Sequence, residues 1–218
     1  MLNLIIADTR HYMKSPMQAF NTITFFLTAT LLFPFAIGTG EKLSAMSAGG
    51  VWVVALMSIS IATGQIFNTD KNDGTLDMWV SFAPSLYAIS MARIISVCVV
   101  YGFSLCILAP IMASSLGLPY VYLSPLFLSL LCATPGLFAI NIFASALTLG
   151  VRGGAVLSAI ITLPFSIPFI IFGSGVVNTA KLGFEFQDAL LLSGGISVIA
   201  LILCPIAISA CIKYQVSR

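Results

Sequence analysis

Three aspartates stand close together in a short polar stretch between two long apolar segments. Asp70, Asp73 and Asp77 are spaced by three and four residues, so one helix through this stretch would carry all three carboxylates on one face. The apolar residues would fall on another face: Leu76, Trp79, Val80 and Ala83. Acids near its first turn would favour the helix dipole, and Pro84 would help to end it. This pattern fits a docking helix for a cytoplasmic partner, or an interfacial loop anchored by Trp79.

Side chains for catalysis are hard to assemble from this sequence. His11 is the only histidine and precedes the first apolar segment. The five cysteines form no C-x-x-C pair, so we interpret them as packing residues rather than metal or redox groups: Cys98, Cys106, Cys132, Cys204 and Cys211. A P-loop of the form G-x-x-x-x-G-K-[ST] is missing. We therefore expect no enzyme activity and no bound metal, and any ATP hydrolysis must come from a separate chain.

The composition identifies the environment of the chain. Of the 218 residues, 59% are hydrophobic and 7% are charged, whereas a soluble domain carries about 25% charged residues. So few charges cannot cover a surface that faces water, so most of this surface must face lipid. The net charge of +2 and the lack of a basic run give no sign of a nucleic-acid partner.

The positions of the charges predict the membrane spans. Asp, Glu, Lys and Arg are absent from residues 43–69, 94–151, 153–180 and 189–212. A spanning helix needs roughly 20 apolar residues, and the turn signal at 117–120 divides the longest gap in two. With a further apolar stretch near the N-terminus, we predict an all-α permease domain over 1–218 with six spans: 21–38, 48–67, 94–116, 123–149, 154–176 and 189–212. Unbroken apolar runs favour helices over the alternating strands of a barrel.

Basic residues in the short loops predict the orientation. With the N-terminus inside, the cytoplasmic side receives seven of them: Arg10, Lys14, Lys71, Arg93, Arg152, Lys213 and Arg218. The opposite side receives Lys42 and Lys181. We therefore expect both termini in the cytoplasm. Residues 2–20 mix apolar and charged side chains in a pattern typical of a helix lying in the membrane interface.

Several stretches resemble one known family. They are Leu32–Gly38, Gly50–Leu56, Asp73–Asp77 with Pro84, Leu149–Leu157, and Leu163–Pro168. The acidic loop pattern also occurs across the wider class of ABC exporters, whereas the Arg152-Gly153-Gly154 run and the paired Pro164 and Pro168 are more particular. Over essentially its whole length the sequence resembles the CcmB family, the permease subunits of the cytochrome c maturation system.

This resemblance implies a membrane subunit that works with a separate CcmA-like ATPase at the bacterial inner membrane. It further implies CcmC, CcmD and the haem chaperone CcmE as partners. Similar organelle-encoded proteins leave the mitochondrial inner membrane as an alternative. The ATPase-coupling loop would be Asp70, Asp73, Gly74, Thr75, Leu76, Asp77 and Pro84. Because 218 residues make about half of a full exporter's membrane domain, two copies are expected by analogy.

Several roles stay open at this point. Arg152 either marks the membrane boundary, with its head group reaching the lipid head groups, or contacts the ATPase. Pro164 and Pro168 either act as a hinge or only kink their span. Haem is a candidate substrate that needs axial ligands; His11, Met57 and Met112 could serve, although an interfacial role for His11 and packing roles for the two methionines are the plainer interpretation.

The function has more than one interpretation as well. The chain either moves haem or another hydrophobic substrate across the membrane, or acts as a scaffold whose ATP-driven motion releases the haem-loaded chaperone.

Overall fold

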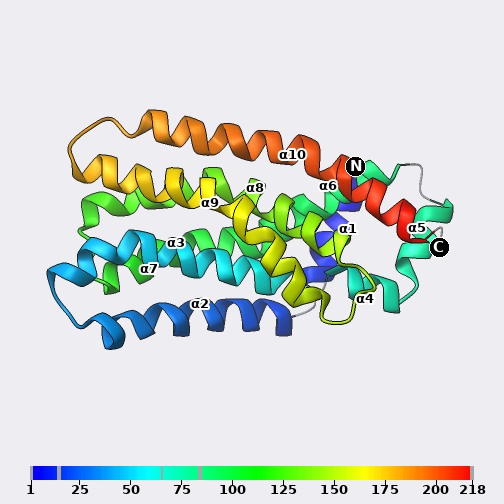
Figure 1. Cartoon of the computed structure of the whole chain (residues 1–218), viewed down its shortest axis with the longest axis horizontal. Coiled ribbons are helices and arrows are strands. Elements are labelled where there is room, and N and C mark those ends of the chain that lie inside the picture. The colour runs from blue at the N-terminus through cyan, green and yellow to red at the C-terminus, as the bar shows by residue number, and fades with distance from the viewer. Residues whose placement is uncertain (1, 14–15, 65, 83–84, 217–218) are drawn as a thin grey trace.

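Six stretches of helix in the described part of the chain are long and apolar enough to cross a membrane, as the sequence predicted. They come from a computed structural model that describes residues 2–13, 16–64, 66–82 and 85–216 (Figure 1). The helices are α1 (Leu2–Met13), α2 (Pro16–Ile37), α3 (Glu41–Thr63), α4 (Ile66–Asn72), α5 (Thr75–Phe82), α6 (Leu86–Val97), η1 (Cys98–Gly102), α7 (Phe103–Ser115), η2 (Tyr120–Tyr122), α8 (Leu123–Leu147), α9 (Gly154–Lys181) and α10 (Gln187–Val216). No strand occurs within those ranges.

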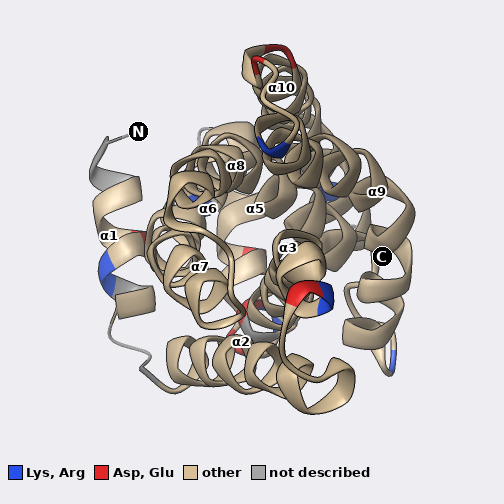
Figure 2. Ribbon diagram, turned by 90° about the vertical axis from the view of Figure 1, so that its left-hand side faces the viewer, with Lys and Arg blue, Asp and Glu red and all other residues tan. Residues whose placement is uncertain are grey.

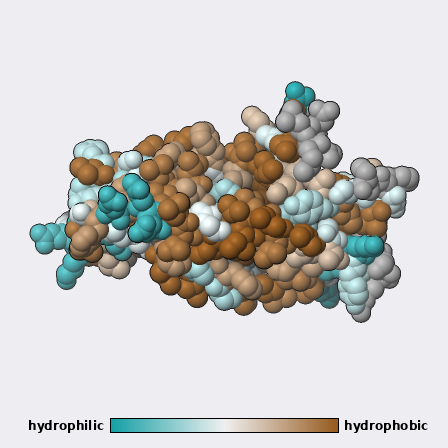
Figure 3. All heavy atoms as spheres, turned by 90° about the horizontal axis from the view of Figure 1, so that it is seen from above, coloured by the Kyte–Doolittle hydropathy of each residue, from teal (hydrophilic) through white to brown (hydrophobic). Residues whose placement is uncertain are grey.

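The hydropathy of the surface agrees with a membrane protein. Figure 3 shows a broad hydrophobic region across the middle of one face of the molecule and hydrophilic residues toward its two ends. Figure 2 looks along the bundle and shows most of the helical ribbon free of charged residues, with several charged positions at the turns. The chain is therefore a multi-pass membrane protein, and the exposed apolar side chains of its spans face lipid or other subunits.

The third span begins earlier than the sequence predicted. We expected it to start at residue 94, with Arg93 in the cytoplasmic loop, but α6 begins at Leu86 and Arg93 is only 4% exposed. The helix starts there because the Ser85 hydroxyl accepts a hydrogen bond from the Ala88 amide, which is a typical N-cap. Within the same span, the π-helical turn η1 separates α6 from α7.

The bundle is packed around α8, which is the most buried of the six described spans, whereas α2 is the least buried. Small residues allow its neighbours to approach closely. A Cβ on Gly136 of α8 would lie 2.6 Å from the Cα of Ser197 on α10, and one on Gly173 of α9 would lie 2.2 Å from the Trp52 ring on α3. These two glycines therefore fix how α10 and α9 sit against the rest of the bundle.

Prolines interrupt the spans without ending them. Pro164 and Pro168 both lie inside α9, which continues from Gly154 to Lys181 and bends along its length in Figure 1. Each proline removes one backbone hydrogen bond, which is a recognised cause of helix bending. The bend is consistent with a static kink, and a hinge role for the two prolines stays a prediction.

The connections alternate between the two ends of the bundle. Figure 1 places both marked chain ends at one end, together with α4, α5 and the loop between α8 and α9. The turns between α2 and α3, α7 and α8, and α9 and α10 lie at the other end. This arrangement agrees with the predicted topology, in which both termini share one side. We call the first end the terminal end.

Candidate coupling site at the terminal end of the bundle

The predicted coupling segment is not one helix but two. The helices α4 and α5 are separated by a turn at Gly74, which has a φ of +72°. Glycine suits this left-handed conformation because it has no Cβ to clash with the backbone. The Gly74 amide donates to the Lys71 carbonyl, 3.1 Å away, and closes the turn. The change in direction means that the three aspartates do not share a single helix face.

The short helix α5 has one anchored side and one open side. Leu76 is 1% exposed and belongs to the hydrophobic core, and Trp79 packs against that core. Asp73 and Asp77 are exposed, and Asp77 lies in the first turn of α5, as predicted, where it favours the helix dipole. Thr75 begins the helix and is half-buried. The segment therefore offers two exposed acidic residues while its apolar side packs against the bundle.

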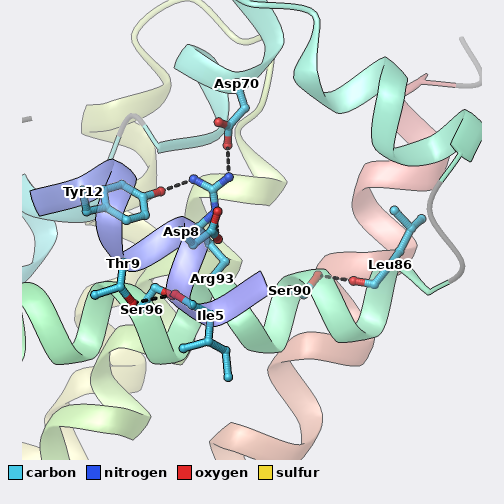
Figure 4. Close-up of polar contacts among 9 residues, drawn as sticks. All are labelled: Ile5, Asp8, Thr9, Tyr12, Asp70, Leu86, Ser90, Arg93 and Ser96. Atoms are coloured by element: carbon cyan, nitrogen blue, oxygen red, sulfur yellow. Dashed lines mark hydrogen bonds and ion pairs between the residues drawn. The ribbon is translucent and has the colours of Figure 1, made fainter. Parts of the chain in front are cut away.

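Arg93 is the centre of a buried polar junction that the sequence analysis missed (Figure 4). Its Nη2 lies 3.1 Å from a carboxylate oxygen of Asp70 on α4, and its Nε lies 3.3 Å from a carboxylate oxygen of Asp8 on α1. Its Nη1 donates a hydrogen bond to the Tyr12 hydroxyl. The guanidinium also stands over the Trp79 ring of α5, 4.9 Å from the ring centroid. One side chain of α6 thus contacts α1, α4 and α5, and we call these five residues the Arg93 junction.

The charges of the junction explain why Arg93 can be buried. An isolated buried charge is very costly, but two carboxylates and two aromatic rings compensate this one. Burial raises the pKa of Tyr12 above its usual value of 10.0, and the nearby Arg93 charge opposes this shift without cancelling it. Tyr12 is therefore a neutral hydrogen-bonding group in the folded protein. The Tyr12 ring also meets the Tyr101 ring of η1 edge-on at 6.0 Å, which connects the junction to the π-helical turn.

The N-terminal helix is tied to the junction by one of its faces. Asp8 points toward Arg93, on the same helix face as Tyr12 four residues later. Arg10 is exposed. The Ser96 hydroxyl of α6 donates to the Ile5 carbonyl at 3.1 Å. The helix α1 is thus fastened to the third span by polar contacts, because Arg93 lies within reach of Asp8.

The loop between α8 and α9 meets the coupling segment from the other side. The Gly150 amide donates to the Asn68 side-chain oxygen of α4, 3.3 Å away. Gly150 has a φ of +79°, and a Cβ there would lie 2.8 Å from the Lys71 amino nitrogen. Arg152, two residues further, is exposed. Its two candidate roles, at the membrane boundary or in contact with an ATPase, are both compatible with this position.

The structure brings some predicted residues together and leaves others apart. Asp70, Leu76 and Trp79 meet at or beside the junction, whereas Pro164 and Pro168 lie in α9 and take no part in it. Pro84 and the His11 side chain lie outside the described part of the chain. The residues that sequence reasoning missed are Asp8, Tyr12, Asn68 and Arg93. One signal in the sequence could have revealed the burial of Arg93. Ser85 is a typical N-cap residue, and a helix that starts there places Arg93 two turns inside the helix.

The Arg93 junction connects elements that lie far apart in the sequence. Among the described residues, no three His, Cys, Asp or Glu side chains gather as a metal site would require. The junction joins α1, α4 and α6 through one guanidinium that makes several contacts, and it cannot change partners without leaving a carboxylate buried and unpaired. The contacts of Trp79, Asp70 and Asp8 with Arg93 therefore connect α5, α4 and α1 to α6.

Comparison with known proteins gives one consistent result. The family described as CcmB protein matches residues 1–215. Heme exporter protein B of Pseudomonas aeruginosa is 33% identical, with 99% of this chain and 97% of that protein covered. Heme exporter protein B of Haemophilus influenzae is also 33% identical, with 100% and 99% covered, and that of Escherichia coli strain K12 is 32% identical over 90% of each chain. The chain therefore belongs to the CcmB protein family.

Proposed function

We propose that this chain is the membrane subunit of a haem-handling exporter that acts in c-type cytochrome maturation. Its relatives in three bacteria carry the name Heme exporter protein B, which supports haem as the substrate. The Arg93 junction is the observation that carries the mechanical part of this proposal. It links the exposed acidic side of α5 to the third span through the contact of the partly buried Trp79 with the buried Arg93.

The energy comes from ATP hydrolysis on a separate subunit, and this chain supplies no catalytic group. The ATPase docks on the exposed carboxylates of Asp73 and Asp77 through basic side chains of its own. Leu76 lies in the core and Trp79 packs against it, so movement of the docked ATPase tilts α5 as a rigid body. Trp79 then presses on Arg93, which pulls on Asp70 and Asp8 and so changes the angle between α1, α4 and α6.

The assembly in this proposal contains two copies of the chain with two CcmA-like ATPase subunits in the bacterial inner membrane. Both termini and the α4–α5 segment then face the cytoplasm, where ATP is available. CcmC, CcmD and the chaperone CcmE are the proposed partners for haem. The positive residues at the terminal end support this orientation, because basic loops stay on the cytoplasmic side.

Co-purification with the ATPase tests the docking surface. We expect the Asp73→Lys/Asp77→Lys variant to lose the ATPase, because two attractive carboxylates become repulsive. The matched control is Glu41→Lys/Asp188→Lys, which reverses two acidic residues in the first turns of α3 and α10, at the opposite end of the bundle. Retention of the ATPase by the first variant, or equal loss from the control, would contradict docking at α5.

Cytochrome formation tests the function itself. In cells that lack their own copy of the gene, the wild-type chain together with its ATPase should restore covalent haem in c-type cytochromes, measured by haem staining. The docking variant should be inactive although it is inserted in the membrane at the wild-type level. Failure of the wild-type chain and its ATPase to restore any haem staining would refute a role in cytochrome maturation.

A further inference from the structure

A large groove lies between α3 and α9, away from the Arg93 junction. It has a volume of about 680 Å³ and is bordered by the start of α2. This volume is in the range of small-molecule sites, about 300–1,000 Å³. Its lining residues run from Val53 on α3 to Gly64, which directly follows that helix, and the eleven steps between them extend about 16 Å. The groove is therefore a long, membrane-level slot whose outer edges, such as Ile61 and Ile160, are exposed.

The lining is uncharged and mainly apolar. Its hydroxyl groups already donate within the chain: Ser60 to the Asn141 side chain at 2.9 Å, Thr162 to the Ser158 carbonyl at 2.8 Å, and Ser166 to the Thr162 carbonyl at 3.0 Å. The walls therefore present mainly apolar surface, and the hydrogens of these three hydroxyl groups are already donated to acceptors within the chain. Such walls suit a large apolar ring system better than a sugar, a peptide or an inorganic ion.

Polar groups gather at one end of the slot. Gln18 and Asn21, from the beginning of α2, are the two carboxamides of the lining. Gln18 donates one N–H to the Ala62 carbonyl at 2.8 Å, and an amide group has a second hydrogen to give. This end lies next to the end of α3, hence toward α4 and the terminal end. It can receive the carboxylates of a ligand whose apolar body fills the rest of the slot.

Met57 stands between the two ends of the slot. It lies four residues from Val53 and seven from Gly64, and it is 50% exposed although it belongs to a membrane span. Met112, the other span methionine considered as a ligand, packs against the core and does not line the slot. A thioether is a soft ligand and one of the side chains that bind haem iron. The slot therefore combines an available axial ligand, apolar walls and neutral hydrogen-bond donors at one end.

We propose that this groove is the haem-binding site of the chain, with Met57 as an axial ligand of the iron and Gln18 and Asn21 facing the propionates. The proposal rests on haem as the substrate in the proposed function and goes further by naming the site and its ligand. The groove opens at membrane level, so haem enters sideways from the lipid. Its carboxylates stay at the terminal end, and its ring lies against α3 and α9.

The test is a titration of the purified full-length protein in nanodiscs with haemin reduced by dithionite, followed by absorption spectroscopy. Wild type should show the spectrum of thioether-ligated ferrous haem, and Met57→Leu should lose that band pattern. The control Met46→Leu changes an equally exposed methionine of the same helix that lies outside the groove, and should keep it.

A second pair of variants tests the place of binding without touching the ligand. Ile160→Trp adds a bulky ring at the exposed edge of the groove and should reduce haem binding. Ile171→Trp makes the same change at an exposed position of α9 outside the groove and should bind as wild type does. The proposal is overturned if Met57→Leu keeps the wild-type spectrum, if Ile160→Trp binds as tightly as Ile171→Trp, or if wild type gives no saturable spectrum.

These outcomes are separate from those of the proposed function. If cytochrome formation depends on the chain and on Asp73 and Asp77 while Met57→Leu changes no spectrum, the groove assignment is wrong and the exporter role stands. If the wild-type chain never supports cytochrome formation, the exporter role fails whatever the spectra show.

Discussion

Replacing Arg93 by methionine should destabilise the protein more than any other single loss of charge at the terminal end. Methionine keeps much of the side-chain volume but leaves the carboxylates of Asp70 and Asp8 without their shared cation. Removing one partner of a buried ion pair costs about 3–5 kcal/mol. The Asp70 side chain is 12% exposed and that of Asp8 is 25% exposed, so most of this cost comes from Asp70.

A double-mutant cycle isolates that contribution. Asp70→Asn removes the charge left behind by Arg93→Met, so the double variant should be more stable than Arg93→Met alone. Contacting charged groups give coupling energies of about 0.5–3 kcal/mol, and we expect this pair in the upper half of that range. The free energies come from reversible unfolding in mixed detergent micelles, followed by circular dichroism.

The control for this cycle is Arg152→Met, an exposed arginine at the same end of the bundle. It should leave the unfolding midpoint unchanged. A loss below about 1 kcal/mol for Arg93→Met, which is the value typical of a surface pair, would refute the buried junction. Additive effects of Arg93→Met and Asp70→Asn would refute the contact between these two side chains.

Two further predictions concern packing and pH. Gly173→Ala should lower the free energy of unfolding by about 1–3 kcal/mol because the added Cβ would lie 2.2 Å from the Trp52 ring. Gly175→Ala has nothing within 4 Å of its Cβ and should raise the free energy of unfolding by about 0.5–1 kcal/mol through helix propensity. The same unfolding assay measures both variants, and equal effects would contradict the close approach of α3 and α9. Burial raises the pKa of Tyr12 in the folded state, so the unfolded chain loses its phenolic proton first and stability falls as the pH rises above about 10. Tyr12→Phe should flatten this alkaline decline in unfolding midpoint, and an unchanged pH profile would show that Tyr12 is not buried as described.

The coupling segment shows which structural features a local sequence pattern predicts and which it does not. The apolar residues Leu76 and Trp79 at helical spacing predicted an amphipathic helix, and the structure places the apolar side of α5 against the bundle. The glycine at position 74 was counted within that helix, but it adopts a left-handed conformation and splits the segment in two. Glycine tolerates both the helical and the left-handed conformation, so its position in the sequence does not tell which of the two it adopts. The packing of α4 and α5 decides between them.

The six spans, the all-helical class and the shared side of both termini followed from the sequence alone. Lipid offers no hydrogen-bond partners, so the apolar gaps between charges had to be helices that close their own hydrogen bonds. The partners of Asp8, Tyr12, Asp70 and Arg93 were decided by tertiary structure alone, because these residues lie far apart in the chain and meet only when α1, α4 and α6 pack together. Sequence rules treat a lone arginine beside a span as a boundary residue facing water. Here the folded chain brings the opposite charges to Arg93, and that compensation allows it to lie inside.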